Sequence, residues 1–396
     1  MTRTGLKLFR KDSPSTATLC SLILSSDATF GFRYLRNRFG NRRFKFPVVP
    51  VGNRTRCDYN AIYQFGDSMS DTGNLIREGP LGIFLPFAHL PYGETTFGEA
   101  TGRCSNGLLM IDFLANALGL PLLNPYLDKN ATFSQGVNFA VAGSTALQTE
   151  RLLENRILSP VTNSSIPVQY NWFLDHLNSI CSSQTDCAKI LGQALFMVGE
   201  TGGNDFNYAL LQGKTIQETQ SLVPGVVDNI IDLARKLINL GAKRLVIPGN
   251  FPIGCFPIYL TAFQTSDTSA YDDKHCLKDL NEFALYQNQY LQGAIQHLRK
   301  EHPGVVIMYA DYYTAFQSVF RRASQLGFDE ASTQKACCGC GGDYNFSLLR
   351  MCGLPGVSAC SNPDQYISWD GIHPTQATFQ RMAEFLITEL SIFHCY

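Results

Sequence analysis

Five short apolar runs, spaced widely along the chain, constrain the fold more than any other feature of the sequence. They occupy residues 61–65, 137–141, 195–198, 244–247 and 305–309, and runs of this length are typical of buried strands. Between them lie stretches with helical periodicity, among them residues 108–118, 226–240 and 277–299. Gly241 stands where a glycine is expected to end the second of these helices. Strands that alternate with helices predict an α/β fold with a parallel sheet covered on both faces.

Composition and length favour a single globular domain. The chain has 396 residues, of which 45% are hydrophobic and 16% charged, as in an ordinary globular protein with a sizeable core. No linker-like tract or repeat follows residue 57, so we expect one domain over 58–396, acting as a monomer. A net charge of −1 argues against nucleic acid or an anionic membrane surface as a partner. There is no run of about 18 apolar residues, and no integral membrane segment is expected.

Residues 1–57 differ in composition from the rest of the chain. They carry 12 lysines and arginines against two acidic residues, Asp12 and Asp27. Such a basic, acid-poor segment is typical of a targeting leader. The apolar stretch at 17–24 is short for a secretory signal, and the arginines of residues 33–43 resemble an organelle transit peptide. A non-native start of the coding sequence is a third interpretation. We expect a secreted protein, with a plastid or another organelle as the alternative.

Cysteines and glycosylation sequons indicate an oxidising compartment. The chain has 13 cysteines, an odd number, so at least one lacks a partner within it. Five of them cluster within residues 337–360, which predicts local disulfides. A zinc site is disfavoured because the C-x-x-C at 337–340 has no second pair to complete it. The candidate N-glycosylation sites are Asn53, Asn130, Asn163 and Asn345.

A serine near the start of the predicted domain and an Asp–His pair near its end are the parts of a hydrolytic triad. Ser68 follows Asp67 just after the first predicted strand, and Asp370 precedes His373 by three residues. A serine at a strand-to-helix turn can present its hydroxyl where backbone N–H groups favour negative charge. A carboxylate beside an imidazole can orient the ring and fix its tautomer. The competing interpretations are that Ser68 or Asp67 caps a helix, and that Asp370 caps a helix over 375–387.

Two further segments could stabilise an oxyanion. Gly202-Gly203-Asn204-Asp205 follows the third predicted strand, and the side-chain amide of Asn204 can donate to an oxyanion. Gly143 follows the second predicted strand and could lend its backbone N–H. Each segment is also compatible with an ordinary turn. Taken together, these segments favour an enzyme that transfers acyl groups, because its chemistry would collect at the carboxyl ends of the strands.

Short motifs spread over most of the chain match those of a known family. They are Phe65-Gly66-Asp67-Ser68, Asp71-Thr72-Gly73-Asn74, Thr101-Gly102-Arg103-Cys104-Ser105-Asn106-Gly107, Asn138-Phe139-Ala140-Val141-Ala142-Gly143, Gly202-Gly203-Asn204-Asp205, Ala336-Cys337-Cys338-Gly339 and Trp369-Asp370-Gly371-Ile372-His373-Pro374. In these motifs the chain resembles the plant GDSL esterase/lipases, a branch of the SGNH hydrolases, from about residue 57 to 390. It departs from the family at Met69, where leucine is usual. It also departs at Cys340, where glycine is usual, and this leaves the odd thiol there or permits a different pairing.

The resemblance implies a fold and a set of roles. The fold would be a three-layer αβα sandwich with a five-stranded parallel sheet, the SGNH or flavodoxin-like hydrolase architecture, and no metal or organic cofactor is implied. Ser68 would be the nucleophile, His373 the general base and Asp370 the residue that orients it. The oxyanion hole would consist of the backbone N–H groups of Ser68 and Gly143 and the side-chain amide of Asn204.

The expected reaction is hydrolysis of a carboxylic ester in two steps through an acyl-enzyme on Ser68. The expected substrate is a small acylated metabolite or a lipid, and the apolar residues 84–92 could line its pocket or simply belong to the core. Two enzymatic alternatives stay open, an acyltransferase that uses the same acyl-enzyme and a cell-wall polysaccharide O-acetyl esterase. A non-catalytic glycoprotein that binds acylated polysaccharides is the alternative from another class.

Overall fold

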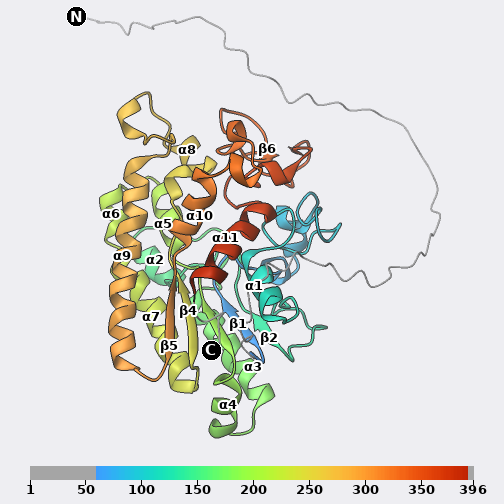
Figure 1. Cartoon of the computed structure of the whole chain (residues 1–396), viewed down its shortest axis with the longest axis vertical. Helices are drawn as coiled ribbons and strands as arrows, with labels where there is room; N and C mark the ends of the chain where they lie inside the picture. The colour runs from blue at the N-terminus through green and yellow to red at the C-terminus, as the bar shows by residue number, and fades with distance from the viewer. Residues whose placement is uncertain (1–58, 391–396) are drawn as a thin grey trace, which may run out of the picture. The chain divides into compact units, whose positions relative to one another are not determined.

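A five-stranded parallel sheet forms the centre of the computed structural model, which describes residues 59–390 (Figure 1). The strands lie in the order β2-β1-β3-β4-β5, and every neighbouring pair is parallel. Their bounds are β1 Ile62–Phe65, β2 Gly136–Asn138, β3 Leu195–Val198, β4 Arg244–Pro248 and β5 Val306–Ala310. The five predicted strands and the parallel sheet are confirmed.

The second strand is shorter than the apolar run that predicts it. The side-chain oxygen of Asn138 accepts a hydrogen bond from the backbone N–H of Ala140 at 2.9 Å, just where β2 ends. Such a local bond from an asparagine competes with regular strand pairing. The apolar pattern over 137–141 therefore overestimates the strand by its last three residues, which run on as a loop beside the end of β1.

The three predicted helices are confirmed to within a few residues. They correspond to α1, α7 and α9, and Gly241, with φ +120°, ends α7 by donating its N–H to Ile238 O. The α-helices are α1 Met110–Leu118, α2 Thr149–Glu154, α3 Ile166–Ile180, α4 Gln184–Leu191, α5 Gly203–Leu211, α6 Ile216–Gln220, α7 Val223–Leu240, α8 Pro257–Ala262, α9 Lys278–Glu301, α10 Tyr312–Arg321 and α11 Gln376–Glu389.

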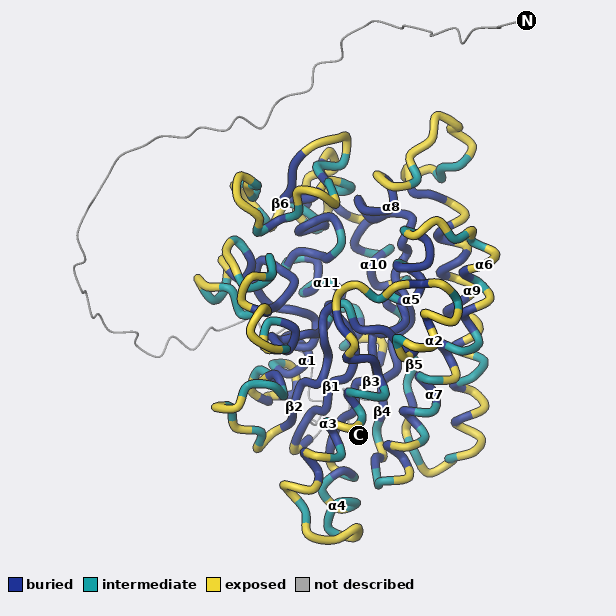
Figure 2. The backbone as a smooth tube through the Cα atoms, turned by 180° about the vertical axis from the view of Figure 1, so that it is seen from behind, coloured by how far each residue is buried: buried dark blue, intermediate teal, exposed yellow. Residues whose placement is uncertain are grey.

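Helices cover both faces of the sheet because the strands that follow β1 in the chain lie on both sides of it. β2 lies on one side of β1, and β3, β4 and β5 lie on the other. Connections between parallel strands are right-handed, so α1, which leads to β2, covers one face and the helices that lead to β3, β4 and β5 cover the other. Accordingly α7 contacts α3 and α9, whereas α11 contacts α1 and α10 (Figures 1 and 2). The connections change direction at β1, and sheets of this kind bind ligands at the carboxyl ends of the strands beside such a point.

Aromatic side chains from the sheet and α3 form the centre of the largest hydrophobic core. Tyr63 of β1 stacks on Phe196 of β3 with ring centroids 5.2 Å apart, and Phe173 of α3 meets both rings edge-on. All three side chains are buried. Full burial of a side chain of this size contributes about 2–3 kcal/mol, so β1 and β3 are firmly held against α3.

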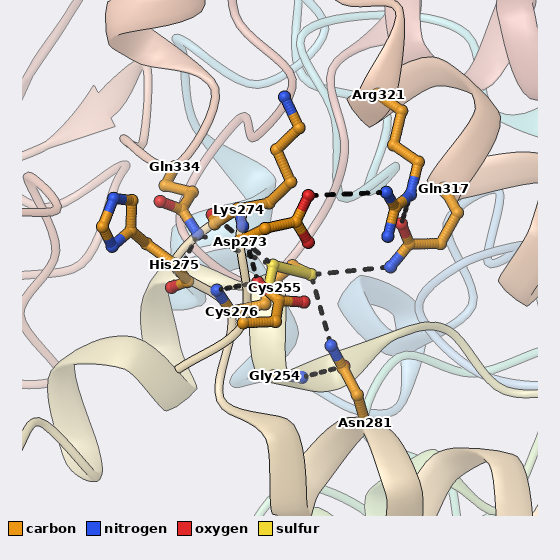
Figure 3. The surroundings of a disulfide bond; sticks show 11 residues. Gly254, Cys255, Asp273, Lys274, His275, Cys276, Asn281, Gln317, Arg321 and Gln334 are labelled. Carbon is orange, nitrogen blue, oxygen red and sulfur yellow. Dashed lines mark hydrogen bonds and ion pairs between the residues drawn. A yellow bond between two sulfur atoms is a disulfide. The ribbon is translucent and has the colours of Figure 1, made fainter. Parts of the chain in front are cut away.

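Four disulfides lie within the described residues, two of them in the predicted cluster. They are Cys181–Cys187, Cys255–Cys276, Cys337–Cys360 and Cys338–Cys352. The prediction of local disulfides is confirmed, and Cys340 and Cys104 are buried free thiols. Figure 3 shows how Cys255–Cys276 ties the segment after β4 to the loop before α9. The side-chain amides of Asn281 and Gln317 point at the Cys255 sulfur from 3.6 and 3.9 Å.

Some predictions fall on residues outside the described range. These are the targeting leader over 1–57 and the glycosylation site Asn53. Within residues 59–390, no helix combines the length and the apolar character that crossing a membrane requires.

Candidate active site

The turn after β1 carries Ser68. Gly66 has φ +145°, and a Cβ there would lie 2.6 Å from the backbone oxygen of Glu200, so only glycine fits. The backbone oxygen of Asp67 accepts hydrogen bonds from the N–H groups of Ser70 and Asp71, which closes a single helical turn around Ser68. Ser68 is buried to 8% exposure at this turn. The carboxyl end of β1 thus presents the serine as the sequence predicts.

The helix expected directly after Ser68 is absent at that position, and the first helical segment is a short 3-10 helix, Leu75–Arg77. Asp71 explains the difference. Its carboxylate accepts the backbone N–H groups of Gly73 and Asn74 at 2.6 Å each, that of Leu75 at 3.0 Å and that of Ala142 at 2.8 Å. These bonds end the turn early and attach it to the loop after β2. The sequence alone indicates no such role for Asp71, because its partner Ala142 is distant along the chain.

The loop after β2 brings Gly143 to the same end of the sheet. Asn74 donates its side-chain amide to the backbone oxygens of Asn138 and Ala140 at 2.8 Å each, which fixes this loop beside the turn that carries Ser68. Gly143 has φ +80°, and a Cβ there would lie 2.4 Å from the side chain of Val161. Glycine is therefore required at 143 for its conformation and for the space it leaves.

Asn204 stands in the first turn of α5, after β3, and links the two turns. Its Nδ2 donates to the backbone oxygen of Ser144 at 2.9 Å and to Asp67 Oδ2 at 3.3 Å. Ser144 adjoins Gly143, and Asp67 adjoins Ser68. The structure therefore brings the predicted oxyanion-hole residues from the ends of β1, β2 and β3 to one place.

Two residues that the sequence analysis missed hold the Asn204 amide in this orientation. Asn207, one helical turn later, donates its Nδ2 to Asn204 Oδ1 at 3.4 Å. The hydroxyl of Tyr259 in turn donates to Asn207 Oδ1. Because the oxygen of Asn204 faces Asn207, its nitrogen must face the turns after β1 and β2. The three-residue spacing of Asn204 and Asn207 could have indicated their contact, whereas nothing in the sequence indicates Tyr259.

Asp370 and His373 form a buried pair in the loop before α11. Asp370 Oδ2 lies 2.7 Å from His373 Nδ1, and Asp370 Oδ1 accepts the backbone N–H groups of Ile372 and His373. Both side chains are buried. A carboxylate only accepts, so Nδ1 carries the proton in the neutral ring and Nε2 is left as the basic atom. The alternative that Asp370 caps the helix is wrong, because Thr375 caps α11 by accepting the N–H of Thr378.

The local electrostatics keep Asp370 ionised. Burial by itself would raise its pKa, but the charge of His373 and the hydrogen bonds from His373 and Ile372 outweigh burial, and the pKa of Asp370 is lowered. The pKa of Asp67 is instead raised. Burial outweighs the hydrogen bond from the N–H of Met69 and the charge of His373, which both lower the pKa. An ionised carboxylate is what a histidine base needs as its partner.

Glu200 is a further buried carboxyl beside this site and was missed by the sequence analysis. Burial raises its pKa well above the ordinary value, and the neighbouring charge of Asp67 raises it further. Its Oε1 has no hydrogen-bond partner within residues 59–390. Burial therefore favours the protonated form of Glu200 and, to a lesser degree, that of Asp67, which limits the negative charge where an oxyanion would develop.

Asp67, which adjoins Ser68, lies near enough to His373 for their charges to interact. No hydrogen bond joins the Ser68 hydroxyl to the His373 ring in the part of the chain that the structure describes. Such bonds are often long in substrate-free enzymes and tighten when the substrate binds. The ring of Phe87 stands edge-on to His373 with centroids 6.1 Å apart, so this residue of the segment 84–92 lies beside the histidine.

The candidate glycosylation sites lie away from these residues in the sequence. Asn130 and Asn163 are exposed. Asn345 is half-buried and donates its side-chain amide to Ala336 O at 2.8 Å. Glycosylation at these positions stays a prediction.

Comparison with known proteins identifies relatives of the whole described region. Residues 62–386 match the family model described as GDSL-like Lipase/Acylhydrolase. The chain is 47% identical over 335 residues to acetylajmalan esterase 2 of Rauvolfia serpentina, which covers 84% of this chain and 91% of that protein. It is 44% identical over 340 residues to sinapine esterase of Brassica napus, which covers 85% of this chain and 87% of that protein. A GDSL esterase/lipase of Arabidopsis thaliana is 44% identical over 343 residues, or 86% of this chain and 85% of that protein.

Proposed function

Because this chain belongs to the family of GDSL-like lipases and acylhydrolases, we propose that it hydrolyses carboxylic esters and that Ser68 carries the acyl group. The observation that supports this most directly is the buried Asp370–His373 pair, with Asp370 Oδ2 2.7 Å from His373 Nδ1. The pair leaves Nε2 of the histidine as a base, and the turn after β1 supplies the serine. A serine, a histidine base and a carboxylate that orients the histidine are the parts of a catalytic triad.

The reaction runs in two steps. The Ser68 oxygen attacks the ester carbonyl carbon while His373 Nε2 takes the hydroxyl proton, and Asp370 stabilises the resulting imidazolium. The tetrahedral intermediate collapses when His373 returns the proton to the leaving alcohol, which leaves the acyl group on Ser68. Water then attacks the acyl-enzyme with His373 again as the base, and the acid is released.

The carbonyl oxygen becomes negatively charged in each step, and three donors surround it. They are the backbone N–H groups of Ser68 and Gly143 and the Nδ2 of Asn204, which lie at the ends of β1, β2 and β3. Their positions are set before the substrate arrives by Asp71, by Asn74 and by the bond from Asn207. Donors fixed in advance stabilise a developing oxyanion more than mobile water does.

We propose small-molecule esters as the substrates. The relatives from Rauvolfia serpentina and Brassica napus are named for acetylajmalan and for sinapine. Phe87 stands beside His373, and Phe84 and Leu90 of the same segment are exposed, which offers apolar surface to an acyl or aryl group. Tyr92, at the end of this segment, is wholly buried and belongs to the core instead.

We also propose that the protein is secreted, with residues 1–57 as its leader and residues 58–396 as one hydrolase domain. The four disulfides support this, because structural disulfides persist in oxidising compartments.

Replacement of Ser68 by alanine tests the assignment of the nucleophile. Ser68→Ala should lose the hydrolysis of p-nitrophenyl acetate and its labelling by a fluorophosphonate probe, while it unfolds at the same temperature as the wild type. Ser70→Ala is the matched control, since Ser70 lies in the same turn and its hydroxyl only accepts a bond from Gln64 at 3.1 Å. Ser70→Ala should keep the rates of hydrolysis and of labelling within about tenfold of those of the wild type. Labelling that persists in Ser68→Ala would show that another residue is the nucleophile.

A further inference from the structure

A wholly buried tyrosine contacts the carboxylate of the candidate triad. The hydroxyl of Tyr92 donates to Asp370 Oδ2 at 2.8 Å, across 278 positions of sequence. The ring is held between Phe87, with centroids 5.2 Å apart, and Trp369, with centroids 6.1 Å apart, and it meets both edge-on. Tyr92 has 0% exposure, so its hydroxyl has no access to water in place of the carboxylate.

This contact completes the hydrogen bonding of Asp370. Oδ1 accepts two backbone N–H groups, from Ile372 at 2.9 Å and from His373 at 2.7 Å. Oδ2 is shared between His373 Nδ1 and the Tyr92 hydroxyl. An ionised carboxylate has about four lone-pair sites, and all of them are used here. The carboxylate can therefore neither rotate nor move without losing a bond.

We propose that Tyr92 is a positioning residue that sets both the orientation and the basicity of His373 by donating to the same oxygen of Asp370. The proposal rests on the role given above to Ser68, Asp370 and His373. Tyr92 draws part of the negative charge of Oδ2 toward its own proton. That charge is then less available to stabilise the protonated imidazole, so the tyrosine keeps His373 less basic than the carboxylate alone would make it.

The other titratable groups that interact with this pair come from two further segments. Asp67, in the turn after β1, interacts electrostatically with His373. The thiol of Cys104 interacts with Asp370, and burial raises its pKa well above the ordinary value. Burial likewise raises the pKa of Tyr92 well above its ordinary value, and the charge of Asp370 adds to this. Cys104 and Tyr92 therefore stay neutral over the useful pH range. Burial raises the pKa of Asp67 to about 7, so Asp67 titrates within that range, and the substitution at 92 removes none of its hydrogen bonds.

Removal of the Tyr92 hydroxyl should shift the pH dependence of activity in one direction. In Tyr92→Phe, the carboxylate has one donor fewer and stabilises the imidazolium more. The acidic limb of the kcat/KM profile for p-nitrophenyl acetate should move to higher pH by about 0.5–1 unit. The plateau kcat should fall roughly tenfold with little change in KM, because Tyr92 does not touch the substrate. Tyr63→Phe is the control, since it removes the hydroxyl of another buried tyrosine and should leave the profile unchanged.

A second variant keeps the inference testable if Tyr92→Phe fails to fold. Site-specific 3-fluorotyrosine at position 92 retains the hydrogen bond but is a stronger donor, so the acidic limb should move to lower pH. In the Ser68→Ala background, the downfield proton NMR signal of His373 Nδ1–H should also change between tyrosine, phenylalanine and fluorotyrosine at 92. An unchanged pH profile and an unchanged signal would overturn the inference while Ser68→Ala still reports on the proposed function. Activity that survives in Ser68→Ala would instead overturn the proposed function.

Discussion

Replacement of Asn204 by alanine should separate catalysis from stability. The side-chain amide has two N–H groups. One is used structurally, in the 2.9 Å bond to Ser144 O, and the other faces Asp67 Oδ2 at the longer distance of 3.3 Å. Only the second can be transferred to a developing oxyanion without a structural loss. Its present bond to Asp67 is long, so little is given up in the ground state.

The magnitudes follow from these two roles. An oxyanion-hole donor from a side-chain amide is worth about 2.7–4 kcal/mol in the transition state, so kcat should fall by roughly 100- to 1000-fold. The lost bond to Ser144 should lower the free energy of unfolding by only about 1 kcal/mol, because Asn204 is half-buried. Asn207→Ala should cost less, roughly tenfold in kcat, because it leaves the donor in place and only frees the amide to rotate.

Steady-state hydrolysis of p-nitrophenyl acetate and urea denaturation would measure the two effects. Asn229→Ala of α7 is a matched control, since Asn229 is also half-buried and its Nδ2 donates to a backbone oxygen, that of Gly225, at 2.9 Å. The control should lose stability to a similar extent and keep its kcat. If Asn204→Ala kept its kcat within about threefold of wild type, the donor role would be refuted.

Three further predictions concern stability. Asp112→Ala should lower the free energy of unfolding by about 3–5 kcal/mol, because it leaves the buried guanidinium of Arg103 without its carboxylate at 2.8 Å. Arg235→Ala, at an exposed pair with Glu301, should cost less than about 1 kcal/mol, and equal losses in urea denaturation would contradict this reasoning. Burial lowers the pKa of His176 from 6.5 to about 4, so its neutral form contributes stability that is present above the ordinary pKa and is lost as the pH falls through the folded one. His176→Phe should therefore lose less stability than wild type when the pH is lowered from about 7 to about 4, and thermal unfolding at both pH values would show an equal loss if the reasoning were wrong.

The strands could be predicted because each is a continuous apolar run, which is how a strand buried on both faces must look. The family motifs similarly indicated the segments that carry Ser68, Asn204 and His373. Prediction failed where a single long-range polar bond decides the local structure. Asp71 bonds to Ala142 and replaces the expected helix by a short turn, and no periodicity records that bond.

The supporting residues of the site were unpredictable for a related reason. Tyr92 looks like an ordinary core residue in the sequence, and its partner Asp370 lies far along the chain. Tyr259 supports Asn204 only through Asn207, so it matches no spacing rule. Side chains that hold a catalytic group in place are chosen by three-dimensional contact, and one sequence carries little trace of it.

The antiparallel pair of β6 (Cys338–Gly339) and β7 (Ser358–Ala359) is cross-linked and contacts the loop that carries His373. Cys337 N donates to Ser368 O at 3.0 Å and Cys338 N to Trp369 O at 2.6 Å, directly before Asp370. Both cysteines are cross-linked, whereas the sheet that supports the serine contains no disulfide. The two sides of the site therefore depend on different constraints, because a segment closed by two disulfides holds the loop of His373, whereas packing of the parallel sheet holds the turn of Ser68.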